Sequence, residues 1–284
     1  MKPEDGHGVV LATMGEHAAP GRDEGVACAR LDLPWARSRP ARVARELILR
    51  GGFGGLLGYY TRRRTTVGER LDSLRPPVLF VANHSSHMDT PLILCALPKP
   101  WRQRTVVAAA ADYFYRDRRA AALVSLAFNT VPVRRKGGGS ENLGHVEGLL
   151  ADRWNLLLYP QGTRSRAGHA ARLRSGAALL AARHQLAIVP IRVAGTHAAM
   201  PPGQSWPRRR VWQPRYPVEV SFGEAIRPRS AHERDEVMER LQAFFAGREP
   251  TPASRDTAIA PDRAFPYAAA TPPPAAPDER RPPL

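Results

Sequence analysis

The middle of the chain alternates short apolar runs, rich in β-branched residues, with longer stretches that suit helices. The runs expected as strands are 78–82, 105–110, 130–133, 155–159, 187–193 and 218–222. The stretches expected as helices are 91–97, 118–128, 141–152, 172–184 and 231–246. This alternation favours an α/β fold, because neighbouring parallel strands need a long crossover, usually a helix, between them. We therefore predict a single α/β domain over residues 76–248, with a largely parallel or mixed sheet flanked by helices.

One proline interrupts the predicted strands. Pro190 falls inside the run 187–193. Proline has no backbone N–H to donate to a neighbouring strand, so it is found mainly on edge strands and at bulges. The sequence therefore predicts that 187–193 is an edge strand or is bulged.

Residues 41–75 precede the predicted domain and have a different character. The stretch 41–61 reads ARVARELILRGGFGGLLGYYT, and three arginines follow it at 62–64. Arg50 and the glycines interrupt its apolar residues, well short of the roughly 20 that a membrane-spanning helix needs. Apolar side chains followed by arginines suit an amphipathic helical segment in the headgroup region of an anionic membrane. The alternative is a pair of ordinary core helices joined by a glycine-rich turn, and both interpretations can hold together.

The positive charge of the chain is confined to its middle. The chain has 284 residues and a formal net charge of +16. Residues 1–40 hold five basic and six acidic residues, and 249–284 hold four and five, so 41–248 carries a net +18. The two ends read as disordered tails, the second rich in proline and alanine, and we predict no signal peptide in the first. Slightly acidic tails argue against a nucleic-acid-binding arm, and we expect an anionic lipid surface or phosphorylated ligand instead.

The cysteines point to a reducing compartment. Cys28 and Cys95 are the only two, so the chain has no disulfide framework, and no close cysteine pair suggests a zinc or redox site. We expect no metal.

The first block of polar residues follows the predicted strand 78–82. It reads Asn-His-Ser-Ser-His-Met-Asp-Thr-Pro and places His84 five positions before Asp89. A histidine can accept a proton near neutral pH, and a carboxylate on its other ring nitrogen fixes the tautomer and stabilises the imidazolium. Three other interpretations remain open: Asp89 or Thr90 caps a helix, the histidines are ordinary partly buried residues, or His84, His87 and Asp89 bind zinc.

Two further blocks follow the strands predicted at 130–133 and 155–159. In the first, three cations at 134–136 precede three glycines at 137–139, which suits phosphate binding but also describes a solvated basic turn. In the second, Gly162 allows close backbone approach, Thr163 offers a hydroxyl and Arg164 offers a planar guanidinium. An ordinary turn is the alternative there.

A fourth stretch mixes aromatic residues with arginines. Residues 206–216 read WPRRRVWQPRY. This pattern suits a membrane interface or single-stranded nucleic acid, and it also fits a plain solvated loop.

The order and spacing of these blocks resemble the 1-acyl-sn-glycerol-3-phosphate acyltransferases, a family of glycerolipid acyltransferases. The matching motifs, in chain order, are Asn-His-x4-Asp, Val-Pro-Val-x-Arg, Tyr-Pro-Gln-Gly-Thr-Arg-Ser, and Ile-Val-Pro-Ile followed by Gly-Thr and Ala-Met-Pro. The resemblance covers residues 41–248.

The resemblance implies a role for each matching position. His84 takes the place of the general base and Asp89 that of the residue which orients it. Substrate binding falls to Arg135, Gln161, Gly162, Thr163 and Arg164. Gln161 stands where the family usually has a glutamate, and Asn129 stands where its second block often has glycine. The glutamine keeps hydrogen-bonding capacity but lacks the charge, which puts the acceptor in question.

The activity implied is transfer of a fatty acyl group from acyl-CoA or acyl carrier protein to the 2-hydroxyl of 1-acylglycerol-3-phosphate, giving phosphatidic acid. No cofactor is implied beyond the acyl donor. The expected partners are this donor, a lysophospholipid acceptor and an anionic membrane surface, and the expected location is the cytoplasmic face of the cell membrane, peripheral or monotopic. The alternatives are another lysophospholipid or glycolipid acceptor, and a non-catalytic basic membrane-binding protein of the same fold.

Overall fold

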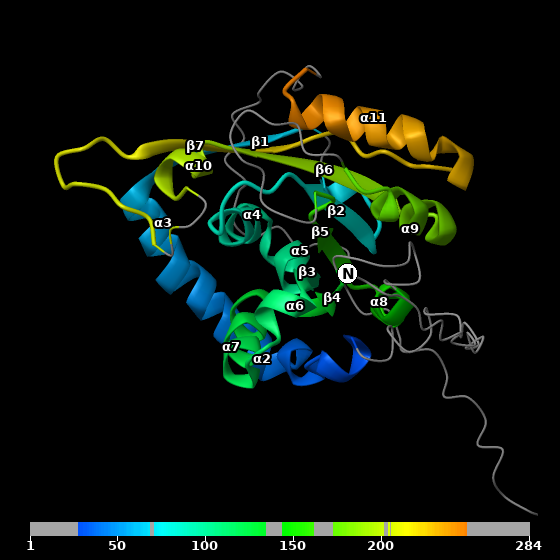
Figure 1. The fold of residues 1–284 in the computed structure, drawn as a ribbon, viewed down its shortest axis with the longest axis horizontal. Coiled ribbons are helices and arrows are strands. Elements are labelled where there is room, and N and C mark those ends of the chain that lie inside the picture. The colour runs from blue at the N-terminus through cyan, green and yellow to red at the C-terminus, as the bar shows by residue number, and fades with distance from the viewer. Residues whose placement is uncertain are drawn as a thin grey trace, which may run out of the picture.

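The computed structural model describes residues 28–68, 71–134, 144–161, 173–201, 204 and 206–248. They form a seven-stranded sheet with the order β1-β7-β6-β2-β5-β3-β4, flanked by helices (Figure 1). All neighbouring strands are parallel except β6 and β7, which are antiparallel. The predicted single α/β domain with a largely parallel sheet is confirmed.

The strands agree closely with the expected runs, with one addition. They are β1 (Thr61–Val67), β2 (Val78–Ala82), β3 (Thr105–Ala110), β4 (Thr130–Val133), β5 (Asn155–Leu158), β6 (Ala187–Ala194) and β7 (Tyr216–Phe222). The sequence did not predict β1, whose residues Thr-Arg-Arg-Arg-Thr-Thr-Val look like a solvated basic stretch. It pairs with β7 along its whole length at the edge of the sheet, where four consecutive residues stay exposed.

Among the described residues the expected helices are also present, together with short ones that the sequence did not predict. The main helices are α2 (Arg39–Leu47), α3 (Gly54–Tyr60), α4 (Asp89–Ala96), α7 (Arg118–Phe128), α8 (Gly144–Ala151), α9 (Gly176–His184) and α11 (Arg234–Phe245). The short additions are α5 (Lys99–Gln103), α6 (Ala111–Phe114) and α10 (Thr196–Ala199).

The sheet has a hydrophobic core on each face, because side chains alternate along each strand. In β2, Val78 and Phe80 face one core with α4 and α5, whereas Leu79 and Val81 face the other with α8, α9 and α11. Figure 1 shows α9 and α11 on one side of the sheet and α4 on the other. Every residue of β2 is buried, as expected for a central strand of a parallel sheet.

Of the two alternatives predicted for Pro190, an edge strand or a bulge, the edge strand is wrong, because β6 lies between β2 and β7. The Pro190 carbonyl accepts the N–H of Gly223, so its backbone faces β7. There, pairing with β7 stops at Phe222 and resumes only at the isolated bridge between Ile188 and Ile226. Two residues of β6 thus oppose three residues after β7, and the missing N–H of Pro190 falls in this bulge.

Glycine is required beside this bulge. A Cβ on Gly223 would lie 2.8 Å from Pro190 Cγ and 2.8 Å from Phe244 Cε2, closer than real contacts allow. The bulge and the absence of a side chain therefore accommodate the proline ring in the interior of the sheet.

The N-terminal helical segment belongs to the same fold. Helix α2 continues through a π-helical turn, η2 (Ile48–Phe53), into α3, and Leu49 and Leu57 are buried in the core. Val43 and Leu47 stay exposed on α2. Part of this segment thus packs against the core, as the core-helix interpretation expects, although the glycines continue the helix and do not form a turn. The membrane interpretation stays a prediction. Within the described residues, no helix has the length and apolar character needed to cross a membrane.

The N-terminal tail predicted over residues 1–40 is too long, because its last residues belong to the fold. Ala36 is fully buried, and its carbonyl accepts a hydrogen bond from the buried guanidinium of Arg45, at 2.6 Å. Arg45 also donates to Leu126 and Ser125 of α7, at 2.9 and 3.0 Å. Residues 28–40 thus belong to the described fold; the rest of this predicted tail, like the tail at 249–284, lies outside the described residues.

The backbone conformation at Asn129 explains why asparagine can stand where the second block of the family often has glycine. It ends α7 with a φ of 55°, in the left-handed region that favours glycine and, among other residues, asparagine. Its side-chain amide donates to the carbonyl of Thr105 at 2.8 Å. Asparagine therefore meets the same backbone requirement as glycine and adds a bond to the start of β3.

Candidate active site

The candidate base lies directly beyond the carboxyl end of β2, where the loops of a parallel sheet gather ligands. Asn83 fastens this loop to β6: its Nδ2 donates to the carbonyl of Val193 at 2.8 Å, and its Oδ1 accepts the N–H of Val193 at 2.7 Å. The two bonds extend the pairing of β2 with β6 by one residue through a side chain. They hold the next residue, His84, in a fixed position.

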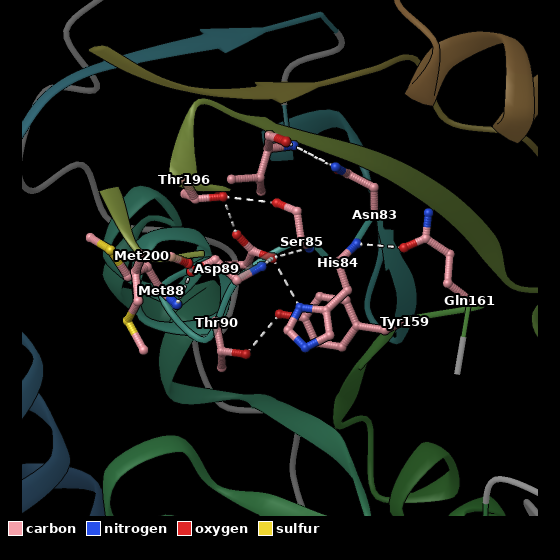
Figure 2. A network of polar contacts seen from close by, with 12 residues as sticks. Asn83, His84, Ser85, Met88, Asp89, Thr90, Tyr159, Gln161, Thr196 and Met200 are labelled. Atoms are coloured by element: carbon pink, nitrogen blue, oxygen red, sulfur yellow. Dashed lines mark hydrogen bonds and ion pairs between the residues drawn. The ribbon is translucent and has the colours of Figure 1, made fainter. Parts of the chain in front are cut away.

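His84 and Asp89 form the pair that the sequence predicts. His84 Nδ1 lies 2.9 Å from Asp89 Oδ2 (Figure 2). A carboxylate only accepts hydrogen bonds, so Nδ1 carries the proton and Nε2 keeps its lone pair. The Asp89 side chain is fully buried, whereas that of His84 is 19% exposed. This geometry leaves Nε2 able to accept a proton, as a general base must.

The Asp89 carboxylate is held by three more donors. Oδ2 also accepts the N–H groups of Ser85 and Ser86, at 2.7 and 2.8 Å, and Oδ1 accepts the hydroxyl of Thr196 at 2.7 Å. Asp89 is the first residue of α4, and its side chain turns back into the loop before the helix instead of capping it. Four donors on one buried carboxylate leave it little freedom to move, so its contact with His84 is preorganised.

Two hydroxyls in series, from Ser85 and from Thr196 at the start of α10, end on this carboxylate. Thr196 Oγ1 donates to Asp89, so in its contact with Ser85 Oγ at 2.9 Å the serine is the donor. Thr196 follows Gly195, which has a φ of 87°. A Cβ there would lie 2.1 Å from the carbonyl oxygen of Pro217, so only glycine fits this turn. Sequence reasoning gave Thr196 no role, although the Gly-Thr pair is one of the matching motifs.

The imidazole stacks on the aromatic ring of Tyr159, the residue directly after β5. His84 and Tyr159 stack with ring centroids 4.3 Å apart and an interplanar angle of 29°. The Tyr159 hydroxyl bonds the hydroxyl of Thr90 at 2.8 Å. Burial, reinforced by the nearby Asp89 carboxylate, raises the pKa of Tyr159 well above its ordinary value. Tyr159 thus stays a neutral platform for the ring, a role that its place in the third block did not reveal.

Gln161 contacts the main chain of the base. Its Oε1 accepts the backbone N–H of His84 at 2.8 Å and ties the loop after β5 to the loop after β2. A glutamate carboxylate could accept the same bond, so the glutamine preserves this hydrogen bond. The predicted site residues that the structure describes, His84, Asp89 and Gln161, therefore lie together in one polar network (Figure 2).

The remaining predicted residues, Arg135, Gly162, Thr163 and Arg164, lie outside the described residues. Among the residues that the structure does describe, no group of three or more histidine, cysteine, aspartate or glutamate side chains is arranged to hold a metal ion. His87, the second histidine of the first block, instead stacks on Tyr113, with ring centroids 6.2 Å apart.

Fold and site together define a class: an α/β domain in which the loop after a central strand carries a histidine oriented by a buried carboxylate. The model of the Acyltransferase family matches residues 63–194 of the chain, a range that contains His84, Asp89 and Gln161. This part of the chain is therefore similar to the Acyltransferase family.

The fold is similar to the crystal structure of the 1-acyl-sn-glycerophosphate (LPA) acyltransferase PlsC from Thermotoga maritima. The TM-score is 0.53 at 19% sequence identity, and the match covers 78% of this chain and 86% of that one. At this identity the match shows a shared fold. The comparison with curated proteins finds no match. The family match supports acyl transfer as the class of activity.

Proposed function

We propose that the protein transfers a fatty acyl group from acyl-CoA or acyl carrier protein to the 2-hydroxyl of 1-acylglycerol-3-phosphate, giving phosphatidic acid. The observation that carries the proposal is the 2.9 Å contact between His84 Nδ1 and Asp89 Oδ2, which leaves Nε2 as a proton acceptor. The motif that contains this pair resembles those of enzymes with this activity.

The reaction needs no nucleophilic side chain, because the acceptor supplies the hydroxyl. His84 Nε2 takes the hydroxyl proton as the acceptor oxygen attacks the thioester carbonyl. The carbon–sulfur bond then breaks, and the thiol leaves with the proton that the imidazolium returns. Asp89 stabilises the imidazolium between these two steps. The proposed phosphate-binding groups are Arg135 and Arg164, on the resemblance alone.

Gln161 favours a second candidate, an acyltransferase for another lysophospholipid or a glycolipid. The side chain that usually carries a negative charge in this family is neutral here, which changes the electrostatic environment of the acceptor. Such an acceptor would carry another headgroup in place of the phosphate monoester, and the chemistry at His84 would be the same.

The test is product identification. Purified full-length protein is given a mixture of lysophospholipid and glycolipid acceptors with acyl-CoA or acyl carrier protein donors, and the acylated products are identified by mass spectrometry. Phosphatidic acid as the main product supports the first candidate, and another acylated lipid supports the second. His84→Ala should lower the rate about 10²- to 10⁴-fold, whereas His232→Ala, a change at an exposed histidine before α11, should leave it unchanged. A His84→Ala rate equal to wild type would overturn the general-base role.

We also propose that the protein works on an anionic membrane surface, at the cytoplasmic face of the cell membrane. The exposed Val43 and Leu47 of α2 and the arginines of β1 at 62–64 support this association. Lysophospholipid acceptors reside in membranes, so an enzyme held there meets them at high local concentration.

A further inference from the structure

We propose that residues 206–215, which connect α10 with β7, form a second membrane-contacting element whose ligand is the interface of an anionic bilayer. This inference adds a partner surface to the proposed membrane association and does not rest on acyl transfer. It is carried by the exposure of two apolar side chains at a turn, by the charge around them and by contacts with α3.

The tip of this connection is a hydrogen-bonded turn that presents apolar side chains to solvent. The N–H of Gln213 donates to the carbonyl of Arg210 at 3.0 Å, and Gln213 Oε1 accepts the N–H of Arg210 at 3.1 Å. Val211 and Trp212, between them, are 77% and 79% exposed, the highest values among the exposed large apolar residues of the described chain. The turn therefore holds two apolar side chains outside the protein in a defined geometry.

The charge around the tip is of one sign. Arg208, Arg210 and Arg215 are exposed, and residues 201–218 contain no aspartate or glutamate. The guanidinium of Arg210 lies 5.9 Å from the Trp212 ring. Indole rings between cationic side chains suit the headgroup level of a membrane, where the ring meets the acyl boundary and the cations meet lipid phosphates.

The connection is fastened to the N-terminal helical segment. Trp206 Nε1 donates to the hydroxyl of Tyr60 at 3.1 Å, and the Arg209 guanidinium lies 4.5 Å above the Tyr59 ring. Figure 1 shows the yellow connection before β7 reaching past α3 at the left of the molecule. The connection and α3 therefore lie at one side of the protein, and α3 continues into α2, which exposes Val43 and Leu47.

A lipid surface fits these observations better than single-stranded nucleic acid. Bases stack on aromatic rings, and Val211 and the exposed aliphatic residues of α2 offer none. Aliphatic side chains at the tip gain free energy by leaving water for the acyl boundary of a bilayer. Arginines bind the phosphates of lipids and of nucleic acids alike, so the apolar side chains are the feature that favours a lipid surface.

The experiment compares vesicle binding by purified full-length variants in a flotation assay. The vesicles are phosphatidylcholine alone or phosphatidylcholine with about one third phosphatidylglycerol, the anionic fraction being chosen for its surface potential. The double variant Val211→Ser/Trp212→Ser should weaken binding to the anionic vesicles about tenfold. Arg208→Gln/Arg210→Gln should weaken it about tenfold or more and should reduce its salt dependence.

Arg227→Gln/Arg229→Gln is the matched control, because it removes the same charge from exposed arginines between β7 and α11. It should bind vesicles within about twofold of wild type, as expected for surface charges remote from the interface. Wild-type binding by Val211→Ser/Trp212→Ser overturns the proposal, and so does an equal loss in the control. Loss of oligonucleotide binding in the tip variant with vesicle binding unchanged would assign the surface to nucleic acid instead.

A second measurement locates the tip directly. Brominated acyl chains quench tryptophans that reach the acyl boundary, so vesicles of brominated lipid should quench wild type more than Trp212→Phe, and equal quenching overturns the proposal. His84→Ala should bind vesicles like wild type. If acyl transfer is not observed, the vesicle-binding results still test the membrane surface. If the tip does not bind membranes, the proposed reaction is still untouched by that result.

Discussion

Replacing Asp89 with asparagine separates the charge of this residue from its hydrogen bonds. The asparagine oxygen can keep the place of Oδ2, which accepts bonds from His84 Nδ1 and the N–H groups of Ser85 and Ser86. The reverse orientation would place an NH₂ group against these three donors. Each donor left without an acceptor would cost about 1–3 kcal/mol of stability. The NH₂ group therefore faces Thr196, whose hydroxyl can turn to accept it and then donate to Ser85.

In this orientation His84 keeps its tautomer, and only the negative charge is lost. Two unit charges about 4 Å apart interact by about 4 kcal/mol at an effective dielectric constant of 20. The remaining neutral hydrogen bond retains part of this stabilisation, so the imidazolium loses about 2–4 kcal/mol. This corresponds to a decrease in kcat/KM of about 30- to 1,000-fold.

The assay is acyl transfer by purified Asp89→Asn, wild type and His84→Ala, with thermal unfolding of each to exclude a folding defect. We expect Asp89→Asn to fall between the other two and to unfold within a few degrees of wild type. An activity within fivefold of wild type, with His84→Ala inactive, would refute the electrostatic role assigned to Asp89.

Three further predictions test the network and the fold. Thr196→Val removes one donor to Asp89 and should lower kcat about tenfold, with rescue by Thr196→Ser; equal rates for valine and serine would contradict this. Tyr159→Phe keeps the ring under His84 and should keep activity. Because folding raises the pKa of the Tyr159 hydroxyl, the stability of the native protein falls as the pH rises above 10.0, the ordinary pKa of tyrosine. Urea unfolding above this pH should therefore show a shallower fall in stability for Tyr159→Phe than for wild type. Gly223→Ala should lower the free energy of unfolding by about 1–3 kcal/mol through the clash with Pro190 and Phe244, and an unchanged urea midpoint would argue against it.

Strands buried on both faces could be predicted from sequence because burial makes them continuous apolar runs. β2, with Val-Leu-Phe-Val-Ala, is the clearest, and its bounds were predicted exactly. β1 could not be predicted, because an edge strand with four exposed residues lacks the run or alternation of apolar residues that marks a strand in a sequence. For a related reason the sequence could not decide between an edge strand and a bulge at Pro190: the bulge that accommodates the proline depends on the residues after β7, far away in the sequence.

The candidate site, like the fold, has contacts that could be predicted from the sequence and contacts that could not. The contact between His84 and Asp89 could be predicted because the two lie only five positions apart and their residue types suit it. The donors that hold the carboxylate include two backbone N–H groups, which leave no mark in the sequence. Thr196 begins α10 just after β6, more than 100 residues later, so its contact exists only after the sheet has formed.

The strand order explains why one histidine receives support from both sides. β2 lies between β6 and β5, so its loop meets a neighbour on each flank. From β6, Val193 pairs with Asn83, and the turn that follows supplies Thr196 to Asp89. From the end of β5, Gln161 accepts the N–H of His84. A base on an edge strand would have only one such neighbour, so the central position of β2 is what lets main-chain and side-chain bonds fix the orientation of the imidazole before a substrate arrives.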